Sequence, residues 1–337
     1  MAATILRIGI AGCGISARIH AARLVSLDQV QIVGLVDPNL ASAKALAAEL
    51  SSKSGGGVES IPVFEDHREL LSELKPDVLG IFTPHRAHYR PAMDGLQAGC
   101  HLFIEKPLST NAQEANDIVK LAKGRGLIVA VGHQYRLQPS LIEARRHLRA
   151  GTIGKLRLIS AIMVAPWLKT QAGPEGDWRS DPKISGGGIL ADLGDHLLDA
   201  LLWMTGQSAV EVAAFQDCTE PGLDIVNAIT LRLSGGTPAT LAISGVSTDS
   251  LFEMRFFGDQ GTLCVKENSL DFHASGTEIQ SIPLAERIES VDSNFVAALC
   301  SESEETVCCP ADEALETVRL QEAIARSAAS GQIVRLA

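Results

Sequence analysis

A lysine stands at the end of one of the apolar runs in this sequence. In HLFIEKPLST, residues 101–110, the run Leu102–Ile104 gives way to Glu105, Lys106 and Pro107. Charged residues at this place can simply solvate the end of a buried strand. The carboxyl end of a strand is also where α/β proteins bind their ligands. A lysine with an ordinary pKa of ~10.4 would act there as a fixed cation that stabilises negative charge on an oxygen.

A second group of residues that could take part in a reaction is the pair Asp192 and His196. They lie in the stretch GILADLGDHLLDALLWMTG, residues 188–206. A separation of four residues places both side chains on one face of the predicted helix. The apolar side chains form a separate stripe that would bury the helix and leave the polar face toward a cleft: Leu193, Leu197, Leu201 and Met204. Histidine, with an ordinary pKa of ~6.5, suits a general base, and Asp199 could orient its ring. A helix start rich in acids, with a solvated histidine, is the plain alternative.

Composition limits the classes of protein that this sequence can be. The chain has 337 residues, of which 46% are hydrophobic and 20% charged, so two globular domains are expected. A net charge of −11 argues against nucleic acid or an anionic membrane surface as the main partner. No apolar run approaches the ~20 residues that cross a bilayer. The N-terminus enters a glycine motif without a basic leader, so we expect a cytoplasmic protein.

The seven cysteines are scattered along the sequence. Their number is odd and their spacing does not match a metal site. We expect buried thiols in a reducing compartment, with no bound metal and no disulfide framework.

The elements that would position these residues change character near residue 132. Up to that point, strand-like runs alternate with helical stretches such as residues 41–50 and 111–126, which predicts a parallel sheet covered by helices on both faces. The runs span residues 5–11, 30–36, 61–64, 77–83, 101–105 and 127–132. From residue 133 to residue 337, short strands joined by turns favour antiparallel pairing. One helix over 188–206 interrupts them, and another over 310–331 closes the chain. The sequence therefore predicts an α/β protein with a doubly wound parallel sheet in 1–132 and an α+β domain in 133–337.

The first strand runs into a glycine motif, Gly12-x-Gly14-x-x-Ala17. The first glycine permits a tight turn, the second lets the backbone approach a pyrophosphate, and the small third residue lets helix and strand pack closely. The helix that opens at Ile15 and Ser16 presents free N–H groups to the phosphates. This loop predicts a dinucleotide site.

Asp37 ends the second strand, where a carboxylate can accept hydrogen bonds from the adenosine ribose hydroxyls. A turn residue before Pro38 is the alternative for Asp37 alone. The acid would repel a 2′-phosphate and no arginine follows it, so NAD is favoured over NADP.

Three stretches together make the sequence resemble the Gfo/Idh/MocA oxidoreductases, a family that includes glucose-fructose oxidoreductase, inositol dehydrogenases and many sugar dehydrogenases. They are TPHRAHYRPAMDGLQAGCHLFIEKPLST (83–110), VGHQYRLQP (131–139) and GGGILADLGDHLLDAL (186–201). The resemblance covers nearly the whole chain. Two positions depart from the family pattern: His85 stands where asparagine is common, on the nicotinamide side, and Cys100 where lysine is common.

The resemblance implies a Rossmann domain, a second domain with a large open sheet, and a pocket for a sugar or polyol. Carried over by motif, the cofactor-binding residues would be Gly12, Gly14, Ile15, Ser16, Asp37, Thr83, His85, His88, Glu105 and Lys106. Lys106, Asp192 and His196 would meet the substrate as catalytic residues.

Four further residues carry weaker expectations. Trp178 and Arg179 would also bind the substrate, although a packed tryptophan on a surface loop is an alternative. Arg136 is a substrate-binding candidate at the domain join, where a structural salt bridge is the alternative. His20 is expected to be a helix-face residue.

The resulting expectation is an NAD-dependent dehydrogenase acting on a hydroxyl of a sugar, inositol or related polyol. An NAD-dependent glycosidase that oxidises its sugar transiently and a catalytically silent NAD- or sugar-sensing regulator are the alternatives. An open sheet with one exposed face predicts a homodimer or homotetramer.

Overall fold

The computed structural model describes residues 5–53, 60–170, 178–220, 222–286, 289–301 and 306–336. The chain forms two units. The first comprises residues 1–109, 113–132 and 289–315, and the second comprises 110–112, 133–288 and 316–337. Each unit has its own sheet, and each is described by itself.

The first unit is built on a six-stranded parallel sheet with the order β3-β2-β1-β4-β5-β6. The strands are β1 (Leu6–Ala11), β2 (Val30–Val36), β3 (Val63–Phe64), β4 (Val78–Ile81), β5 (His101–Ile104) and β6 (Val129–Val131). These strands are almost continuously apolar and buried, as expected for a sheet covered on both faces. The strand order reverses between β1 and β4, which is where such sheets bind ligands at their carboxyl ends.

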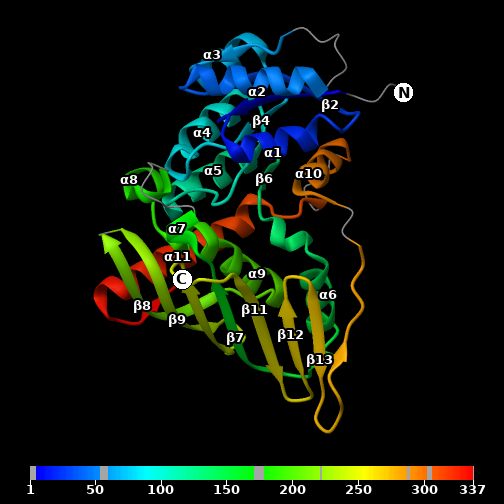
Figure 1. The fold of residues 1–337 in the computed structure, drawn as a ribbon, viewed down its shortest axis with the longest axis vertical. Coiled ribbons are helices and arrows are strands. Elements are labelled where there is room, and N and C mark those ends of the chain that lie inside the picture. Colours follow the sequence, from blue (N-terminus) through cyan, green and yellow to red (C-terminus); the bar gives the residue numbers. More distant parts are fainter. Residues whose placement is uncertain are drawn as a thin grey trace. The chain divides into compact units, whose positions relative to one another are not determined.

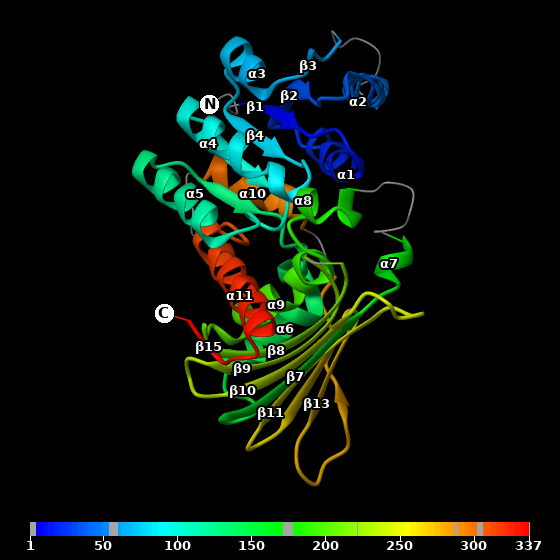
Figure 2. The same cartoon turned by 90° about the vertical axis from the view of Figure 1, so that its left-hand side faces the viewer.

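Five helices connect these strands. They are α1 (Ile15–Leu24), α2 (Leu40–Lys53), α3 (His67–Leu74), α4 (Tyr89–Ala98) and α5 (Ala112–Arg125), with a 3-10 turn, η1 (His85–Ala87), before α4. Figure 2 shows α1 and α2 on one side of the strands and α3, α4 and α5 on the other. Local sequence sets their ends: Asp66 caps α3 by accepting a hydrogen bond from the Arg68 N–H, and α4 ends at Gly99 with φ of 90°.

A segment from late in the sequence completes the first unit. Helix α10 (Val291–Cys300) lies beside α1 (Figure 1), and its Phe295 ring packs 5.6 Å from that of Phe103. Further along, the carbonyl of Cys309 accepts a hydrogen bond from the Val131 N–H of β6 at 2.9 Å. Residues 289–315 thus pack with the first unit, although a division of the sequence at residue 133 assigns them to the second.

The second unit contains a nine-stranded sheet with the order β14-β13-β12-β11-β7-β10-β9-β8-β15. Its strands are β7 (Leu156–Val164), β8 (Ala209–Glu220), β9 (Leu223–Leu233), β10 (Pro238–Ser244), β11 (Leu251–Gly258), β12 (Thr262–Lys266), β13 (Ser269–His273), β14 (Gln280–Ser281) and β15 (Val334–Arg335). Neighbouring strands are antiparallel except β7 and β10, which are parallel. The expected fold class, a doubly wound parallel sheet followed by a large, mostly antiparallel sheet, is confirmed.

Helices cover one face of this second sheet. Figures 1 and 2 show α6 (Pro139–Arg149), α9 (Asp195–Thr205) and α11 (Ala311–Ser330) on that face. Leu141 of α6, Leu201 of α9 and Leu320 of α11 belong to the same buried apolar cluster as the inward-facing strand residues. The strands alternate buried and exposed positions, as in β10, so the other face of the sheet carries the exposed side chains.

Short turns complete the second unit. They are the 3-10 turns η2 (Gln134–Leu137) and η3 (Trp178–Ser180), the one-turn helices α7 (Trp167–Thr170) and α8 (Pro182–Ser185), and the π-helical turn η4 (Leu190–Gly194). The single helix expected over 188–206 therefore begins with a π turn that contains Asp192, and regular α-helix starts only at Asp195. Within the described residues, every helix is too short or too polar to cross a membrane.

Candidate active site

The glycine loop has the backbone geometry that a dinucleotide requires. Gly12 has a φ of 89°, and a Cβ there would lie 2.7 Å from the backbone of Phe82 and Thr83, so only glycine fits. A Cβ at Gly14 would meet no described atom within 4 Å. The space above Gly14 is therefore available to a ligand.

Asp37 is fixed by backbone donors at the end of β2. Its Oδ2 accepts a hydrogen bond from the Cys13 N–H at 2.9 Å, and its Oδ1 accepts one from the Asn39 N–H at 2.8 Å. Burial, with a further contribution from Asp37, raises the pKa of the Cys13 thiol to about 12. The carboxylate is thus tied to the glycine loop itself, beside a thiol that stays neutral.

Two further observations fit a bound dinucleotide at this edge. Helix α1 starts after Gly14, which has no side chain to cap the first N–H groups, so these groups can bind phosphate oxygens. At the end of β4, Thr83 Oγ1 is a buried oxygen with no hydrogen-bond partner among the described residues. A buried hydroxyl of this kind calls for a partner, which a ligand would supply.

Lys106 lies at the carboxyl end of β5, in a turn that is braced from β4. The Lys106–Pro107 peptide bond is cis, as the sequence allows, and Lys106 is only 8% exposed. The ring of His88 joins the two strand ends, since Nδ1 lies 2.8 Å from the carbonyl oxygen of Pro107 and Nε2 lies 2.9 Å from that of Thr83. Burial lowers the pKa of His88. The expected cofactor residue His88 is itself completely buried and lies between these two carbonyls.

In the second unit, Asp192 is held by a pair of donors. Its Oδ2 accepts a hydrogen bond of 2.7 Å from Trp167 Nε1 and one of 3.0 Å from Arg179 Nε. The guanidinium of Arg179 stacks on the ring of Trp178, 4.3 Å from its centroid. The structure therefore brings three expected substrate-binding residues together, and it adds Trp167, which belongs to no motif in the sequence.

His196 follows one turn later, at the start of α9, and packs against aromatic rings. The Tyr135 ring lies 4.9 Å from the imidazole at an angle of 30°, and the His133 ring lies 6.2 Å away, edge-on. Both His196 and Asp192 are about 95% buried, at 4% and 5% exposure. The polar face of the helix is thus buried. The apolar stripe in the sequence had predicted that this polar face would lie open toward a cleft.

Asp199 forms an ion pair with Arg136. It accepts two hydrogen bonds from Arg136, from Nε at 2.9 Å and from Nη2 at 2.6 Å, and it lies 3.5 Å from His133 Nδ1. Burial alone would raise the pKa of Asp199, but Arg136 and the two imidazoles of His133 and His196 hold it below its ordinary value. The structural ion pair, the alternative for Arg136, is therefore present.

Asp224 is a residue that sequence reasoning missed. Its carboxylate accepts hydrogen bonds from the N–H groups of Gly188 and Leu190 at 2.8 and 2.9 Å, and from Asn227 Nδ2 at 2.7 Å. These bonds fix the glycine loop that leads into the π turn of Asp192. Asp224 lies on β9, so the contact depends on chain folding that no local pattern announces.

The expected residues are thus gathered in two groups. The first unit holds the glycine loop, Asp37, Thr83 and the Glu105–Lys106 turn, and the second holds Asp192, His196, Trp178, Arg179 and Arg136. His85 is buried in η1, and Ile15 is 80% exposed at the start of α1. Convergence of Lys106 with Asp192 and His196 stays a proposal.

The strand order, the glycine loop and the acid that ends β2 define a dinucleotide-binding Rossmann domain joined to a second, open-sheet domain. Comparison with known families makes this specific. Residues 6–133 match the Gfo/Idh/MocA oxidoreductase family with its NAD-binding Rossmann fold, and residues 141–264 match the C-terminal domain of the same family. The chain belongs to this family, and the expected enzyme class, an NAD(P)-dependent oxidoreductase, is confirmed.

Individual relatives agree with this assignment. The chain is 29% identical over 303 residues to UDP-N-acetylglucosamine 3-dehydrogenase from Acidithiobacillus ferrooxidans, covering 89% of this chain and 87% of that protein. It is 28% identical over 212 residues to D-glucoside 3-dehydrogenase from Escherichia coli, covering 63% of this chain but only 57% of that protein. A solved structure of levoglucosan dehydrogenase in complex with NADH and levoglucosan superposes with a TM-score of 0.86 at 18% identity, over 98% and 99% of the two chains, which shows the shared fold.

Proposed function

We propose that this protein is an NAD-dependent dehydrogenase that oxidises a secondary hydroxyl group of a sugar or related polyol, or catalyses the reverse reduction. The observation that supports the proposal most is the position of Lys106. It is a buried cation at the carboxyl edge of the parallel sheet, one strand beyond the β1–β4 reversal where the dinucleotide binds. Solvation cannot explain a lysine that is 8% exposed.

The two groups of residues divide the chemistry between them. A bound nicotinamide supplies the hydride acceptor. Lys106 donates a hydrogen bond to the reacting hydroxyl oxygen and stabilises its developing negative charge. His196 accepts the hydroxyl proton, so the alcohol loses one hydride and one proton in all. Asp192, oriented by Trp167 and Arg179, accepts a hydrogen bond from a neighbouring hydroxyl.

Asp37 supports NAD rather than NADP as the cofactor. Its carboxylate is fixed at the end of β2 by the N–H groups of Cys13 and Asn39. A 2′-phosphate at this place would meet a negative charge that cannot turn away without breaking these bonds.

The substrate class rests on the relatives. The two curated relatives described above are named for oxidation at position 3 of a glucoside and of a nucleotide-linked N-acetylglucosamine. A carboxylate beside an arginine stacked on tryptophan suits the hydroxyl groups and apolar ring face of a pyranose. A glucoside or a related pyranose is therefore the first substrate to test.

A spectrophotometric screen tests the proposal. Purified protein is incubated with NAD or NADP and a panel of glucosides, free sugars, inositols and sugar acids, and absorbance of the reduced cofactor is followed. We expect steady NADH formation with at least one pyranoside. Release of an aglycone without net NADH would instead identify a glycosidase, and tight NAD binding without turnover of any compound would identify a regulator.

Association and location are further proposals. Three large apolar side chains lie on the sheet face opposite the helices: Leu158 (38% exposed), Phe215 (80%) and Leu251 (42%). We expect a second copy to cover this face in a homodimer or homotetramer, measurable as molar mass by light scattering. A reducing cytoplasm is the compartment that suits seven cysteines without a disulfide among them.

A further inference from the structure

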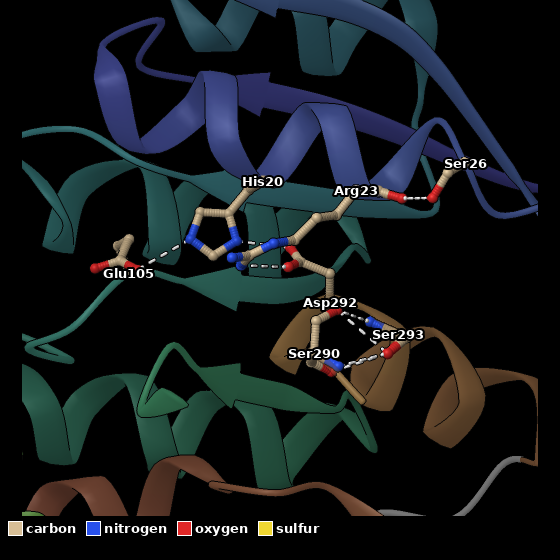
Figure 3. A network of polar contacts seen from close by, with 7 residues as sticks. All are labelled: His20, Arg23, Ser26, Glu105, Ser290, Asp292 and Ser293. Carbon is tan, nitrogen blue, oxygen red and sulfur yellow. Dashed lines mark hydrogen bonds and ion pairs between the residues drawn. The ribbon is translucent and has the colours of Figure 1, made fainter. Parts of the chain in front are cut away.

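His20, in the middle of α1, is enclosed by two carboxylates of the first unit. Its Nδ1 lies 2.6 Å from Oδ1 of Asp292, and its Nε2 lies 3.1 Å from Oε1 of Glu105. Figure 3 shows the ring between these two acids, which come from α10 and from the end of β5. His20 is 5% exposed, so the face of α1 on which it lies is buried at this position.

The geometry determines the charge of this ring. Ionised carboxylate oxygens only accept hydrogen bonds, so both ring nitrogens must donate, and an imidazole that donates from both nitrogens is a cation. Burial alone would lower the pKa of His20, but the hydrogen bonds to Asp292 and Glu105 raise it to about 9. The ring stacks on Phe82, at 4.7 Å and 15°, and the tilted ring of Phe103 lies 5.2 Å away. The His20 ring is therefore held in a fixed position and carries a positive charge near neutral pH.

Asp292 anchors this cation firmly. Its side chain is completely buried, and its second oxygen lies 3.3 Å from Nη1 of Arg23, which is one turn beyond His20 on α1. Ser290 caps α10 directly before it, in a capping box with Ser293. His20 and Arg23, two cations of α1, thus both face Asp292. His20 donates its second hydrogen bond to Glu105.

Glu105 is confined from the opposite side as well. A Cβ at Gly132 would lie 2.9 Å from Glu105 Oε1, so the carboxylate occupies the room that a side chain at Gly132 would need. The Glu105 N–H continues the sheet by donating to the carbonyl of Ile81 at 2.9 Å. The residue directly before Lys106 is therefore fixed through both its backbone and its side chain.

We propose that His20 is a positioning residue: its imidazolium, anchored by Asp292, holds the Glu105 carboxylate and thereby fixes the turn that presents Lys106. The proposal rests on the function proposed above, in which Lys106 contacts the reacting oxygen. It also gives α1 two tasks, since the helix opens at the dinucleotide loop and carries the group that positions the neighbouring strand end.

The variant His20→Gln tests this role, because glutamine keeps a hydrogen-bonding side chain but cannot carry the charge. We expect kcat to fall roughly 10- to 100-fold, as for a misplaced catalytic group, while the dissociation constant of NAD measured by calorimetry changes less than about threefold. His67→Gln is the matched control. His67 lies on α3 between Asp66 and Asp94, with Nε2 2.8 Å from Asp94, and kcat of His67→Gln should stay unchanged.

A double-mutant cycle distinguishes positioning from a general structural role. Glu105→Gln should lower kcat to a similar extent, and the double variant should lose no more than about threefold beyond the larger single loss, because His20 acts through Glu105. Losses that multiply, or a His20→Gln enzyme with wild-type kcat, would overturn the proposal. Where His20→Gln fails to fold, Asp292→Asn replaces it in the same cycle.

The charge of His20 has a readout that requires no substrate. In the full-length protein labelled with ¹⁵N-histidine, the resonances lost in His20→Gln should report two protonated ring nitrogens at pH 7.5 and titrate near pH 9. A neutral ring at pH 7.5 would overturn the proposal whatever the enzyme oxidises. A wild type that shows the cation but oxidises no polyol would contradict the proposed function alone, and the crystal structure of His20→Gln would then decide the positioning: an unmoved Lys106 turn overturns it.

Discussion

The indole nitrogen of Trp167 donates a hydrogen bond of 2.7 Å to Oδ2 of Asp192. Trp167 follows strand β7 and is 1% exposed, whereas Asp192 lies in the π turn before α9. The same oxygen accepts a bond of 3.0 Å from Arg179. A rigid aromatic side chain and an arginine therefore orient the carboxylate that we assign to substrate binding.

Replacing Trp167 by phenylalanine removes one donor and keeps most of the ring. We expect kcat/KM for the sugar to fall roughly tenfold, because a hydrogen bond to a charged group contributes about 1.5–3 kcal/mol and the carboxylate is then less well oriented. NAD affinity, measured by calorimetry, should be unaffected. Trp203→Phe is the comparison, since that ring packs on the guanidinium groups of Arg145 and Arg136, at 4.2 and 5.9 Å. Equal losses in both variants would contradict a role for Trp167 at Asp192.

The variant Lys106→Ala should lose most of kcat and still bind NAD, because the ammonium stabilises charge that develops only during the reaction. A loss of roughly 10³-fold is expected for removal of a group that stabilises an oxyanion. Lys123→Ala provides the matched control, since Lys123 is half exposed and pairs with Asp312 on the surface of the first unit. Full turnover by Lys106→Ala in steady-state assays would refute the catalytic role.

Asp37→Ser tests the choice of cofactor. Removing the carboxylate removes both the acceptor for ribose hydroxyls and the charge that repels a 2′-phosphate. We expect kcat/KM for NAD to fall by at least about tenfold and the ratio of NADP to NAD activity to rise. A preference for NADP in the wild type would show that another residue sets the specificity.

The pH dependence of stability should carry the signature of His20. The two carboxylates raise its pKa from 6.5 to about 9. A group whose pKa is raised on folding stabilises the native state fully below its unfolded pKa, and this stabilisation is lost as the pH rises through the folded value. Unfolding free energies from urea titrations should therefore fall between pH 6.5 and 9 by an amount on the order of 3 kcal/mol.

The difference between wild type and His20→Gln isolates this contribution. It should be largest below pH 6.5 and shrink toward pH 9, since the glutamine does not titrate. A difference that stays constant with pH would mean that His20 is neutral in the folded protein.

Gly188→Ala tests the support of the Asp192 turn. A Cβ at Gly188 would lie 1.9 Å from the carbonyl oxygen of Asp224 and 2.5 Å from its nitrogen, and these backbone atoms cannot give way as a flexible side chain could. We expect destabilisation of about 3 kcal/mol and loss of activity, measured by urea unfolding and turnover. Gly124→Ala is the control: within the described chain its Cβ meets no atom within 4 Å, so alanine inside α5 should stabilise by about 0.5–1 kcal/mol.

Local patterns were sufficient for the first sheet and its cofactor loop. Gly12 and Gly14 predicted a tight turn between strand and helix, and Asp37 followed at the end of the second strand, because these features depend on neighbouring residues and short crossovers. Lys106 was recognisable for the same reason, since a strand end is local information. The boundary of the first unit was less accessible, because α10 returns to it from nearly 300 residues along the chain.

The sequence by itself determined the class of fold, the cofactor loop and the residue types available for hydride transfer. Only the tertiary structure decided which carboxylate side chains accept hydrogen bonds from which donors. Asp199 pairs with Arg136, Asp192 accepts a hydrogen bond from the indole of Trp167, and His20 becomes a cation between Glu105 and Asp292. Each of these pairings joins residues at least 25 positions apart. A hydrogen bond forms only when the donor and acceptor are placed to within a few tenths of an ångström. The spacing of residues along the chain does not encode positions this accurately.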